Sequence, residues 1–497
     1  MIKASRFKAK EDKEKEFKFS LFGKAQNPKD DARVLEIGQA SKCFNLITDD
    51  GTLKNGYGIK DFAMPESSDN LAEESKVNVR GNEVKTIWKL KWYDINRGEN
   101  CYYLFYFNDE NLICFDNLFE ERHATYVIPN EFTDVPYATH YRKDGQDAIL
   151  LSGEGSNLTV ITGDNYLTSE TAPRIINCCS HYGKLFAITY TERGVLVYNE
   201  NPNVLEWSDD KTSNLDFSDD RGDLNKIISF NDYLYVFRDF GITEISEYGN
   251  DEAFSISHIY QSTAYIVPNS IAQAGGKIFF LEGTKIKQFN GNTVKELNID
   301  CLKYLEGISQ RFAFGVCFEG KYYLACRGNF DDGRVVGCEA SENGYKNNML
   351  IVYSIEDEHV DVLRGVDINE MLALTNIFKS KLVMCFNNEN VGKIGEITKE
   401  GNVFGECFGG VWESGKTDFS MPGKIKRIKN FSIQSEGDCK ITISSECESR
   451  VFSIKGSDSL QKITANILGK QFVVKIETEE GANVDISELT LTVSERQ

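Results

Sequence analysis

The 497-residue sequence has little proline, histidine and tryptophan, with eight, five and four copies. It has no apolar stretch that approaches the ~18–20 residues needed to cross a bilayer. Its first residues, Met1 to Arg6, are charged where a secretory signal would be apolar. These absences predict a chain that is made in a cytoplasm and is not inserted in a membrane.

Signatures of catalysis and of metal binding are also missing. The sequence has no G-x-S-x-G elbow, no phosphate-binding loop and no G-x-G-x-x-G motif. The histidines show no paired spacing that would suggest metal or triad chemistry; they are His123, His140, His181, His258 and His359. We therefore predict a protein that is not an enzyme, with no catalytic, cofactor-binding or metal-binding residues and no cofactor.

The thirteen cysteines include no C-x-x-C pair, and their number is odd. Most of them lie inside apolar runs, where a thiol behaves as a small buried hydrophobic group; examples are Cys101, Cys114, Cys317, Cys326 and Cys385. This usage argues against a disulfide framework and against structural zinc. We expect reduced, buried thiols.

Negative charge is concentrated in the middle of the chain. The net charge is −20, but residues 1–29 hold nine basic and four acidic residues, and residues 411–497 hold twelve and thirteen, which leaves −24 on the middle. Such a surface repels nucleic acid and anionic membranes. Most of these charges serve solubility, although an acidic body also suits a conduit past which DNA slides without sticking.

A short pattern recurs along the chain: a tight-turn residue followed by an apolar strand. The turn residues lie 49, 44, 44 and 60 positions apart; they are Gly183, Asp232, Gly276, Gly320 and Ser380. A second strand follows each of the first four copies, so that each pair is typical of a β-hairpin. Repeats of about 40–50 residues built from strands are typical of propeller blades.

Two weaker units, at residues 100–115 and 144–161, extend the same scheme upstream. Six or seven units therefore fit between Thr86 and Thr398, and they predict an all-β fold with a six- to seven-bladed β-propeller. The alternative is a series of β-sandwiches whose spacing mimics a period by chance. Long helical patterns are missing, and residues 297–309 are the best candidate for a helix.

We expect three regions. Residues 1–85 lack the hairpin rhythm and suggest an extended arm with one or two strands, near residues 33–37 and 44–47, that packs on the body or on a neighbouring subunit. The charged run 8–16 is alternatively a solvated helix face or partly disordered. Residues 86–410 form the propeller. Residues 411–497 contain six short alternating strands, which predict a compact antiparallel β-sandwich.

Several stretches resemble bacteriophage tail proteins. Residues 204–209 (VLEWSD), 215–218 (LDFS) and 227–237 (IISFNDYLYVF) are similar to the propeller core of the hub and nozzle proteins of short-tailed phages. Residues 412–419, 422–429 and 467–472 are similar to the C-terminal domains of phage tail structural proteins. The resemblance covers roughly residues 172–491 and does not extend to the first 85 residues.

The resemblance implies a structural component of a virion tail, assembled in the host cytoplasm: a hub, nozzle or adaptor ring that contributes to the genome-ejection conduit. It implies a homo-oligomeric ring, commonly six-fold, that contacts portal, adaptor and other tail proteins. DNA would pass through the lumen without specific binding. Heterologous contacts whose rotation closes produce such a ring.

Other readings stay open at this point. Propellers also host glycosidases, but the repeated Ser-x-Asp-x-Gly-x-Thr-Trp turn of sialidases is absent. A glycan- or receptor-binding propeller on a phage or cell surface needs exposed aromatic residues. Because the chain has 22 tyrosines, this alternative stays open. A cellular scaffold that binds peptides on its rim is a third. The acidic cluster around Trp207 is a solvated loop or a calcium site; it comprises Asp209, Asp210, Asp216, Asp219, Asp220 and Asp223.

Overall fold

The computed structural model describes residues 14–19, 40–49, 51–62, 84–94, 99–107, 111–116, 123–129, 136–143, 146–153, 157–162, 165–169, 172–200, 207, 212–247, 254–297, 299–330, 346–375, 379–387, 392–407, 409–478 and 483–495. Within these ranges the chain is all-β, as the sequence predicts, and contains no α-helix. Two short 3-10 helices occur, η2 (Pro268–Ser270) and η3 (Asp300–Leu305). The second lies inside the segment 297–309 that has the best helical pattern.

Six four-stranded antiparallel sheets follow one another, and in each the strands pair in sequence order. The first three sheets are β6 (Thr86–Asp94), β7 (Glu99–Phe107), β8 (Asn111–Asp116) and β9 (His123–Pro129); β10 (Tyr137–Lys143), β11 (Gln146–Ser152), β12 (Leu158–Thr162) and β13 (Asn165–Ser169); and β14 (Ile175–His181), β15 (Lys184–Thr189), β16 (Val195–Asn199) and β17 (Thr212–Asp216).

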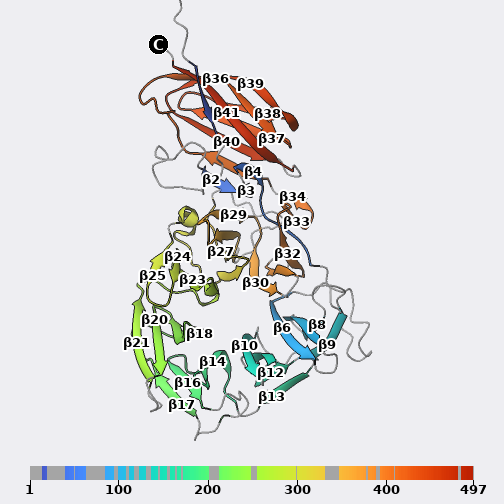
Figure 1. The fold of residues 1–497 in the computed structure, drawn as a ribbon, viewed down its shortest axis with the longest axis vertical. Helices are drawn as coiled ribbons and strands as arrows, with labels where there is room; N and C mark the ends of the chain where they lie inside the picture. The colour runs from blue at the N-terminus through green and yellow to red at the C-terminus, as the bar shows by residue number, and fades with distance from the viewer. Residues whose placement is uncertain are drawn as a thin grey trace, which may run out of the picture.

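The next three sheets are β18 (Leu224–Phe230), β19 (Tyr233–Arg238), β20 (Gly241–Glu247) and β21 (Phe254–Gln261); β22 (Ala272–Ala274), β23 (Lys277–Glu282), β24 (Lys285–Phe289) and β25 (Val294–Glu296); and β26 (Phe314–Phe318), β27 (Lys321–Cys326), β28 (Met349–Ser354) and β29 (Val360–Arg364). Figure 1 shows the sheets arranged in a propeller-like ring, with the first strand of each sheet toward the centre and the fourth toward the outside.

A seventh sheet combines the two ends of the ring-forming chain. Its strands β30 (Ile368–Thr375), β31 (Ser380–Phe386) and β32 (Ile394–Thr398) are followed in space by β5 (Gly58–Asp61), then β33 (Asn402–Val403) and β34 (Glu406–Cys407). An N-terminal strand thus takes the fourth place, antiparallel to β32. β30 also contacts β6, so that the seventh sheet lies beside the first.

The recurring turn of the sequence is a two-residue hairpin loop with both central residues at positive φ. This holds for four consecutive hairpins, at Tyr182-Gly183, Asn231-Asp232, Gly275-Gly276 and Glu319-Gly320, where φ lies between 45° and 72°. Two positive φ values are the requirement of a type I′ turn, whose twist matches that of the strands it joins. Glycine, asparagine and aspartate at these places follow from that geometry.

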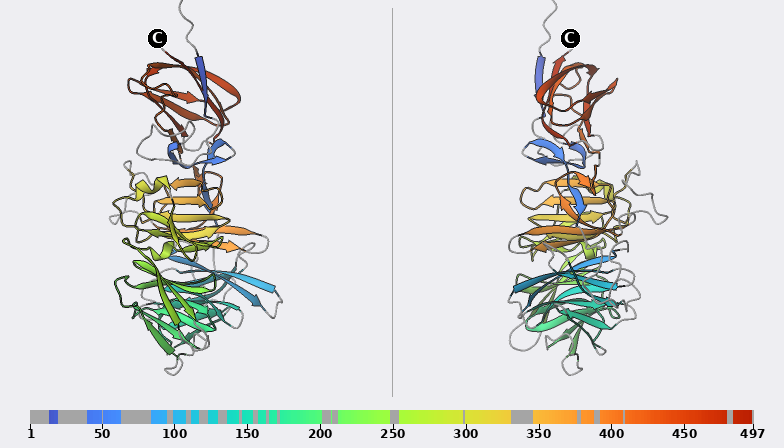
Figure 2. Two further views of the ribbon diagram at one scale, coloured as in Figure 1. Left: turned by 60° about the vertical axis from the view of Figure 1, so that its left-hand side comes forward. Right: turned by 90° about the vertical axis from the view of Figure 1, so that its right-hand side faces the viewer.

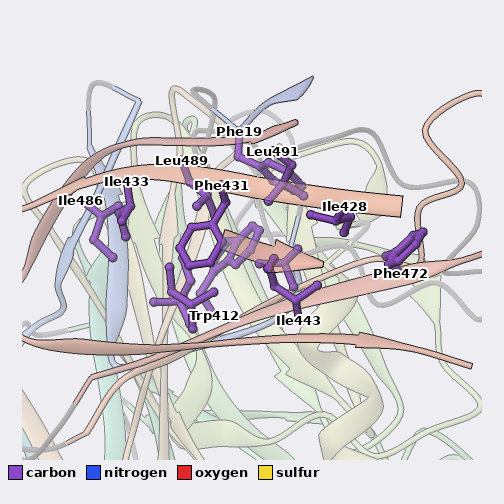
Figure 3. Close-up of a cluster of buried hydrophobic side chains, with 14 of the residues drawn as sticks. Phe19, Trp412, Ile428, Phe431, Ile433, Ile443, Phe472, Ile486, Leu489 and Leu491 are labelled. Atoms are coloured by element: carbon purple, nitrogen blue, oxygen red, sulfur yellow. The ribbon is translucent and has the colours of Figure 1, made fainter. Parts of the chain in front are cut away.

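The remaining strands form two sheets that face each other. One has the order β3 (Leu46–Asp49), β4 (Thr52–Asn55), β41 (Asp485–Glu495), β36 (Lys426–Ser435), β39 (Ser457–Gly469), with β1 (Glu14–Lys18) beside β41. The other has the order β2 (Ala40–Phe44), β35 (Val411–Ser414), β40 (Phe472–Thr478), β37 (Cys439–Ser445), β38 (Ser449–Ile454). Their inner faces share one apolar core, in which Trp412 and Phe431 are fully buried (Figure 3).

The segment Phe44 to Ile47 joins these two sheets to the ring. Phe44 packs in the core of the fifth and sixth ring sheets, Leu46 in the core of the two facing sheets, and Ile47 in the core of the seventh. Between them, Asn45 Oδ1 accepts a hydrogen bond from the Arg364 backbone N–H at 2.7 Å, beside β29. Figures 1 and 2 accordingly show the two sheets mounted on the outer edge of the ring.

The six strands expected after residue 411 correspond to β36 through β41. The segment 44–47 expected to be extended spans the end of β2 and the start of β3. The expected strand at 33–37 lies outside the described residues, and so does most of the charged run 8–16, whose end belongs to β1. The boundaries between the three regions, at residues 85 and 410, stay a prediction. In the structure, strands that precede residue 85 share sheets with strands that follow it.

The contribution of β5 to the seventh sheet can be tested at Ile59, whose side chain is fully buried in the core beside β32. Replacing Ile59 by alanine should lower the free energy of unfolding by about 2–5 kcal/mol, because a buried cavity remains. Lys60→Ala is the control, since the Lys60 side chain is half exposed and its partner Glu396 also pairs with Lys381. Equal denaturation midpoints for the two variants would refute the closing role of β5.

Candidate functional site

The first strands of most neighbouring sheets contact each other around the ring, and several of them carry polar interactions between sheets. Contacts join β10 to β14, β14 to β18, β22 to β26, β26 to β30 and β30 to β6. In three of these strands a register shift precedes a polar residue, which is Asn177 in β14, Lys226 in β18 and Glu370 in β30. A β-bulge re-aims the side chain that follows it.

Each of these three side chains bonds to the backbone of the next sheet. Asn177 Oδ1 accepts the backbone N–H of Ile227 at 2.7 Å, and Lys226 Nζ donates to the carbonyl of Ile271 at 2.7 Å. Backbone groups at a boundary between sheets have no ladder partner, and leaving them unsatisfied would cost free energy. The bulged residues therefore tie neighbouring sheets together through hydrogen bonds that hydrophobic packing alone does not supply.

A set of four such bonds lies where the seventh sheet meets the first. Glu370 accepts the Thr86 hydroxyl at 2.5 Å and the backbone N–H of Ile87 at 3.4 Å. Two further bonds cross the same boundary: Asn369 Nδ2 donates to the Lys85 carbonyl at 2.6 Å, and Lys89 Nζ donates to the Ala373 carbonyl at 2.5 Å. We call residues 85–89 and 369–373 the closing seam.

Three titratable groups on these first strands, Glu370, Lys226 and Lys89, have shifted pKa values, chiefly because surrounding protein atoms remove water. Burial raises the pKa of Glu370 to about 7, although the bonds from Thr86 and Ile87 oppose the shift. Burial lowers the pKa of Lys226 to about 8 and lowers the pKa of Lys89. Glu370 and Lys89 lie at the same boundary, but each shift comes mainly from burial and neither side chain is the cause of the other's shift.

His140 in β10 belongs to the same neighbourhood. Crowding by protein atoms lowers its pKa, and the Lys89 charge lowers it further, while Asp147 opposes both effects. The side chain nevertheless keeps a solvent-exposed surface. A polar side chain that is exposed and yet surrounded by protein suits a position on the inner side of the ring.

The acidic cluster is organised around a buried arginine. Arg238, at the end of β19, is fully buried, and its guanidinium donates to Asp219 at 2.9 Å and to the Gly222 carbonyl at 2.8 Å. Arg221 also pairs with Asp219, at 3.1 Å. Partial burial disfavours the ionised Asp219, but the hydrogen bonds from both arginines outweigh it and lower its pKa to about 2.

The other members of the cluster are spread out. Asp216 accepts the backbone N–H of Ser218 at 2.8 Å, and Asp220 is largely exposed beside Arg221. Asp209 and Asp210 lie outside the described residues. No sequence spacing indicated Arg238 as the partner of Asp219, because nineteen positions separate them and the contact depends on the fold.

The structure places the described histidine side chains apart from one another. His140, His181 and His258 lie in β10, β14 and β21. His359 precedes β29, where Asp361 accepts from its ring at 2.9 Å; burial opposes its protonation, yet this bond leaves its pKa raised. Sequence reasoning missed that His258 approaches Asp219, at 4.0 Å.

Within the described ranges no group of three or more histidine, cysteine, aspartate or glutamate side chains is placed to hold a metal ion. Nor does any helix there have the length and apolar character to span a membrane.

No protein-family model matches the sequence, and no curated protein matches it. Among solved structures, the chain is similar to BBS1N, solved in complex with ARL6DN, with 12% identity, a TM-score of 0.41, and coverage of 65% of this chain and 94% of that one. It is also similar to the extracellular domain of the putative one-component system BT4673 of B. thetaiotaomicron, with 8% identity, a TM-score of 0.42, and coverage of 90% and 62%. Likenesses of this strength carry no argument about function.

Stability should depend on pH through Glu370. Its folded-state pKa lies above the ordinary value of 4.5, so the unfolded chain loses the proton first and stability falls as pH rises from about 4.5 to 7. Glu370→Gln keeps an acceptor for Thr86 and removes the charge. At pH 8 the variant should therefore be more stable by up to about 3 kcal/mol, with little difference at pH 4.5.

Melting temperatures of both proteins across pH 4.5–8 measure this effect. Glu356→Gln is the matched control, because Glu356 is exposed on the turn after β28. A gain for Glu370→Gln that is the same at every pH would show that ionisation of Glu370 is not its source.

The Asp219 pair makes a second prediction. Asp219→Asn leaves the Arg238 charge buried without a carboxylate, so the free energy of unfolding at pH 7 should fall by about 3 kcal/mol. Because the pKa of Asp219 is lowered, the wild-type advantage is full above about pH 4 and is lost as pH falls toward 2. Asp220→Asn, at an exposed neighbour, should change little; equal losses in the two variants by denaturant titration would contradict the assignment.

Proposed function

We propose that this chain is a structural, non-enzymatic component of a bacteriophage tail, namely a hub, nozzle or adaptor ring that contributes to the genome-ejection conduit. One observation carries the proposal. The N-terminal segment completes the ring of sheets at β5 and ties the two facing sheets to it at Phe44–Ile47. A single stiff body results, with separate surfaces on the ring and on the facing sheets.

We further propose that the seven ring sheets are the blades of a closed seven-bladed propeller and that the two facing sheets form a β-sandwich. Contact between β30 and β6 supports the closed ring, and the shared core around Trp412 supports the sandwich. Stiffness matters for such a role, because a subunit of a ring must hold its neighbours at a fixed rotation for the ring to close.

The resemblance to tail hub and nozzle proteins supports the same function through packing residues. Trp207 packs against the core between the second and third sheets, and Trp412 is fully buried between the facing sheets. Both tryptophans thus belong to apolar cores, which suits a component whose role is assembly.

The charge fits a lumen that DNA crosses without specific binding. The middle of the chain, which forms most of the ring, carries the −24 charge, and negative surfaces repel the phosphate backbone. The partners in this proposal are further copies of the chain together with portal, adaptor and other tail proteins. The location is the virion tail after assembly in the host cytoplasm.

The alternative is a propeller that binds a glycan or another receptor. Exposed tyrosines favour it, since aromatic faces are common platforms for sugars: Tyr137, Tyr166, Tyr233 and Tyr265 are each 40–46% exposed. Tyr137 also lies 5.9 Å from Tyr190, which makes a small aromatic pair. Tight and selective binding on a glycan array, with no assembly, would favour this function over the structural one.

Assembly is the direct test of the structural function. The purified chain, mixed with the portal and adaptor proteins of the same particle, should form closed rings in negative-stain micrographs, with a discrete copy number by mass photometry. The chain alone is the control, and it should assemble less readily. A chain that stays monomeric with those partners present would sink the proposal.

A further inference from the structure

Strand β1 is an added strand on one edge of the facing sheets. It pairs only with β41, in the register Glu14↔Ser494 through Lys18↔Thr490. β4 pairs with β41 at Ile486 and Asp485, so β1 occupies the remaining stretch of that edge. Most of its side chains are exposed, and its attachment depends on main-chain pairing plus a few anchors.

Two aromatic residues at alternate positions anchor β1. Phe19 is 1% exposed within the core of the facing sheets, beside Leu491 in Figure 3, and its ring makes an edge contact with Trp412 at 6.2 Å. The ring of Phe17 lies 4.8 Å from that of Phe419. The Phe19 backbone N–H donates to the Leu489 carbonyl at 2.7 Å.

Two ion pairs also join β1 to the sheet, so the sheet edge favours an added strand with matching charges. Lys18 pairs with Glu488 at 3.0 Å, and Glu14 pairs with Lys429 at 2.7 Å. Main-chain bonds, two apolar contacts at alternate positions and matched charges are the elements by which a sheet edge recognises an added strand. We call β41 residues 489–494 the acceptor edge.

The covalent connection does not determine which copy supplies β1. Phe19 and Ala40 lie in the same core, yet twenty residues connect them. Such a segment can reach up to about 70 Å when extended. A strand from a second copy would make the same contacts, so exchange costs no interaction, and neighbours held in a ring meet at high effective concentration.

We propose that Glu14–Phe19 is an exchangeable donor strand and that, in assemblies of this chain, it enters the acceptor edge of a second copy. The exchange links neighbouring subunits through an edge that would otherwise present open hydrogen-bonding groups. This inference deepens the proposed ring function and rests on it only for the biological setting. The exchange of strands itself requires two copies of this chain and no other tail protein.

Cysteine pairing in the full chain tests the exchange. Lys18 and Thr490 are paired opposite each other, and opposed positions in antiparallel strands lie within about 4.5–5.5 Å at Cβ, close enough for a disulfide after small adjustments. One preparation carries Lys18→Cys and the other Thr490→Cys, both with the exposed Cys447 replaced by serine. After mixing and oxidation, a disulfide between these positions forms only between chains.

The expected result is a covalent dimer from the mixture, in assembled rings and in concentrated chain alone, and no such dimer from either preparation by itself. A peptide of residues 10–22 should compete and reduce the dimer. The matched peptide with Phe19→Asp should compete at least about tenfold more weakly, because an aspartate cannot enter the apolar core of the facing sheets without losing its hydration.

A chain carrying both cysteines reports the opposite outcome. If it cross-links within itself while the mixture yields no dimer, β1 stays with its own chain and the proposal is overturned. If the doubly substituted chain does not cross-link at all, the pairing of β1 with β41 is wrong, which overturns it as well. Rings without exchange would refute this inference alone, whereas exchange without rings would refute only the proposed tail function.

Discussion

The structure depends on strand pairing between the beginning and the end of the chain. Residues 40–61 supply β2, β4 and β5, which pair with β35, β41 and β32, more than 300 positions away. Closing so long a loop costs entropy, which only many simultaneous contacts can offset. The ring and the facing sheets are therefore completed together, by one segment that belongs to both.

Phe44, Asn45, Leu46 and Ile47 show how a short segment couples larger bodies. Three apolar side chains enter three different cores, and the asparagine, at φ 58°, bonds to the backbone beside β29. Since cores pack at high density, a residue shared in this way transmits a displacement of one body to the other. Rigid mounting of the facing sheets on the ring follows.

Polar ties play a corresponding part inside the ring. Hydrophobic packing between neighbouring sheets has no direction, but the bonds from Asn177, Lys226 and Glu370 have fixed donors and acceptors. They set how each sheet is placed against the next. The buried Arg238 does the same for the connection that enters the fourth sheet, since it bonds to two carbonyls and a carboxylate there. The polar groups therefore fix the relative orientation of the sheets, and the apolar side chains supply the packing that holds the sheets together.

The sequence alone determined the hairpins and the later strands, because both depend on neighbours in the chain. Positive φ at Gly183 or Asp232 and the alternation in residues 426–495 are local properties that a pattern can reveal. Three pairings arise only in the folded chain: β5 beside β32, Glu370 with Thr86, and Asp219 with Arg238. Those pairings join residues with no shared period or motif, so their energy arises from burial and geometry that exist only after the chain has folded.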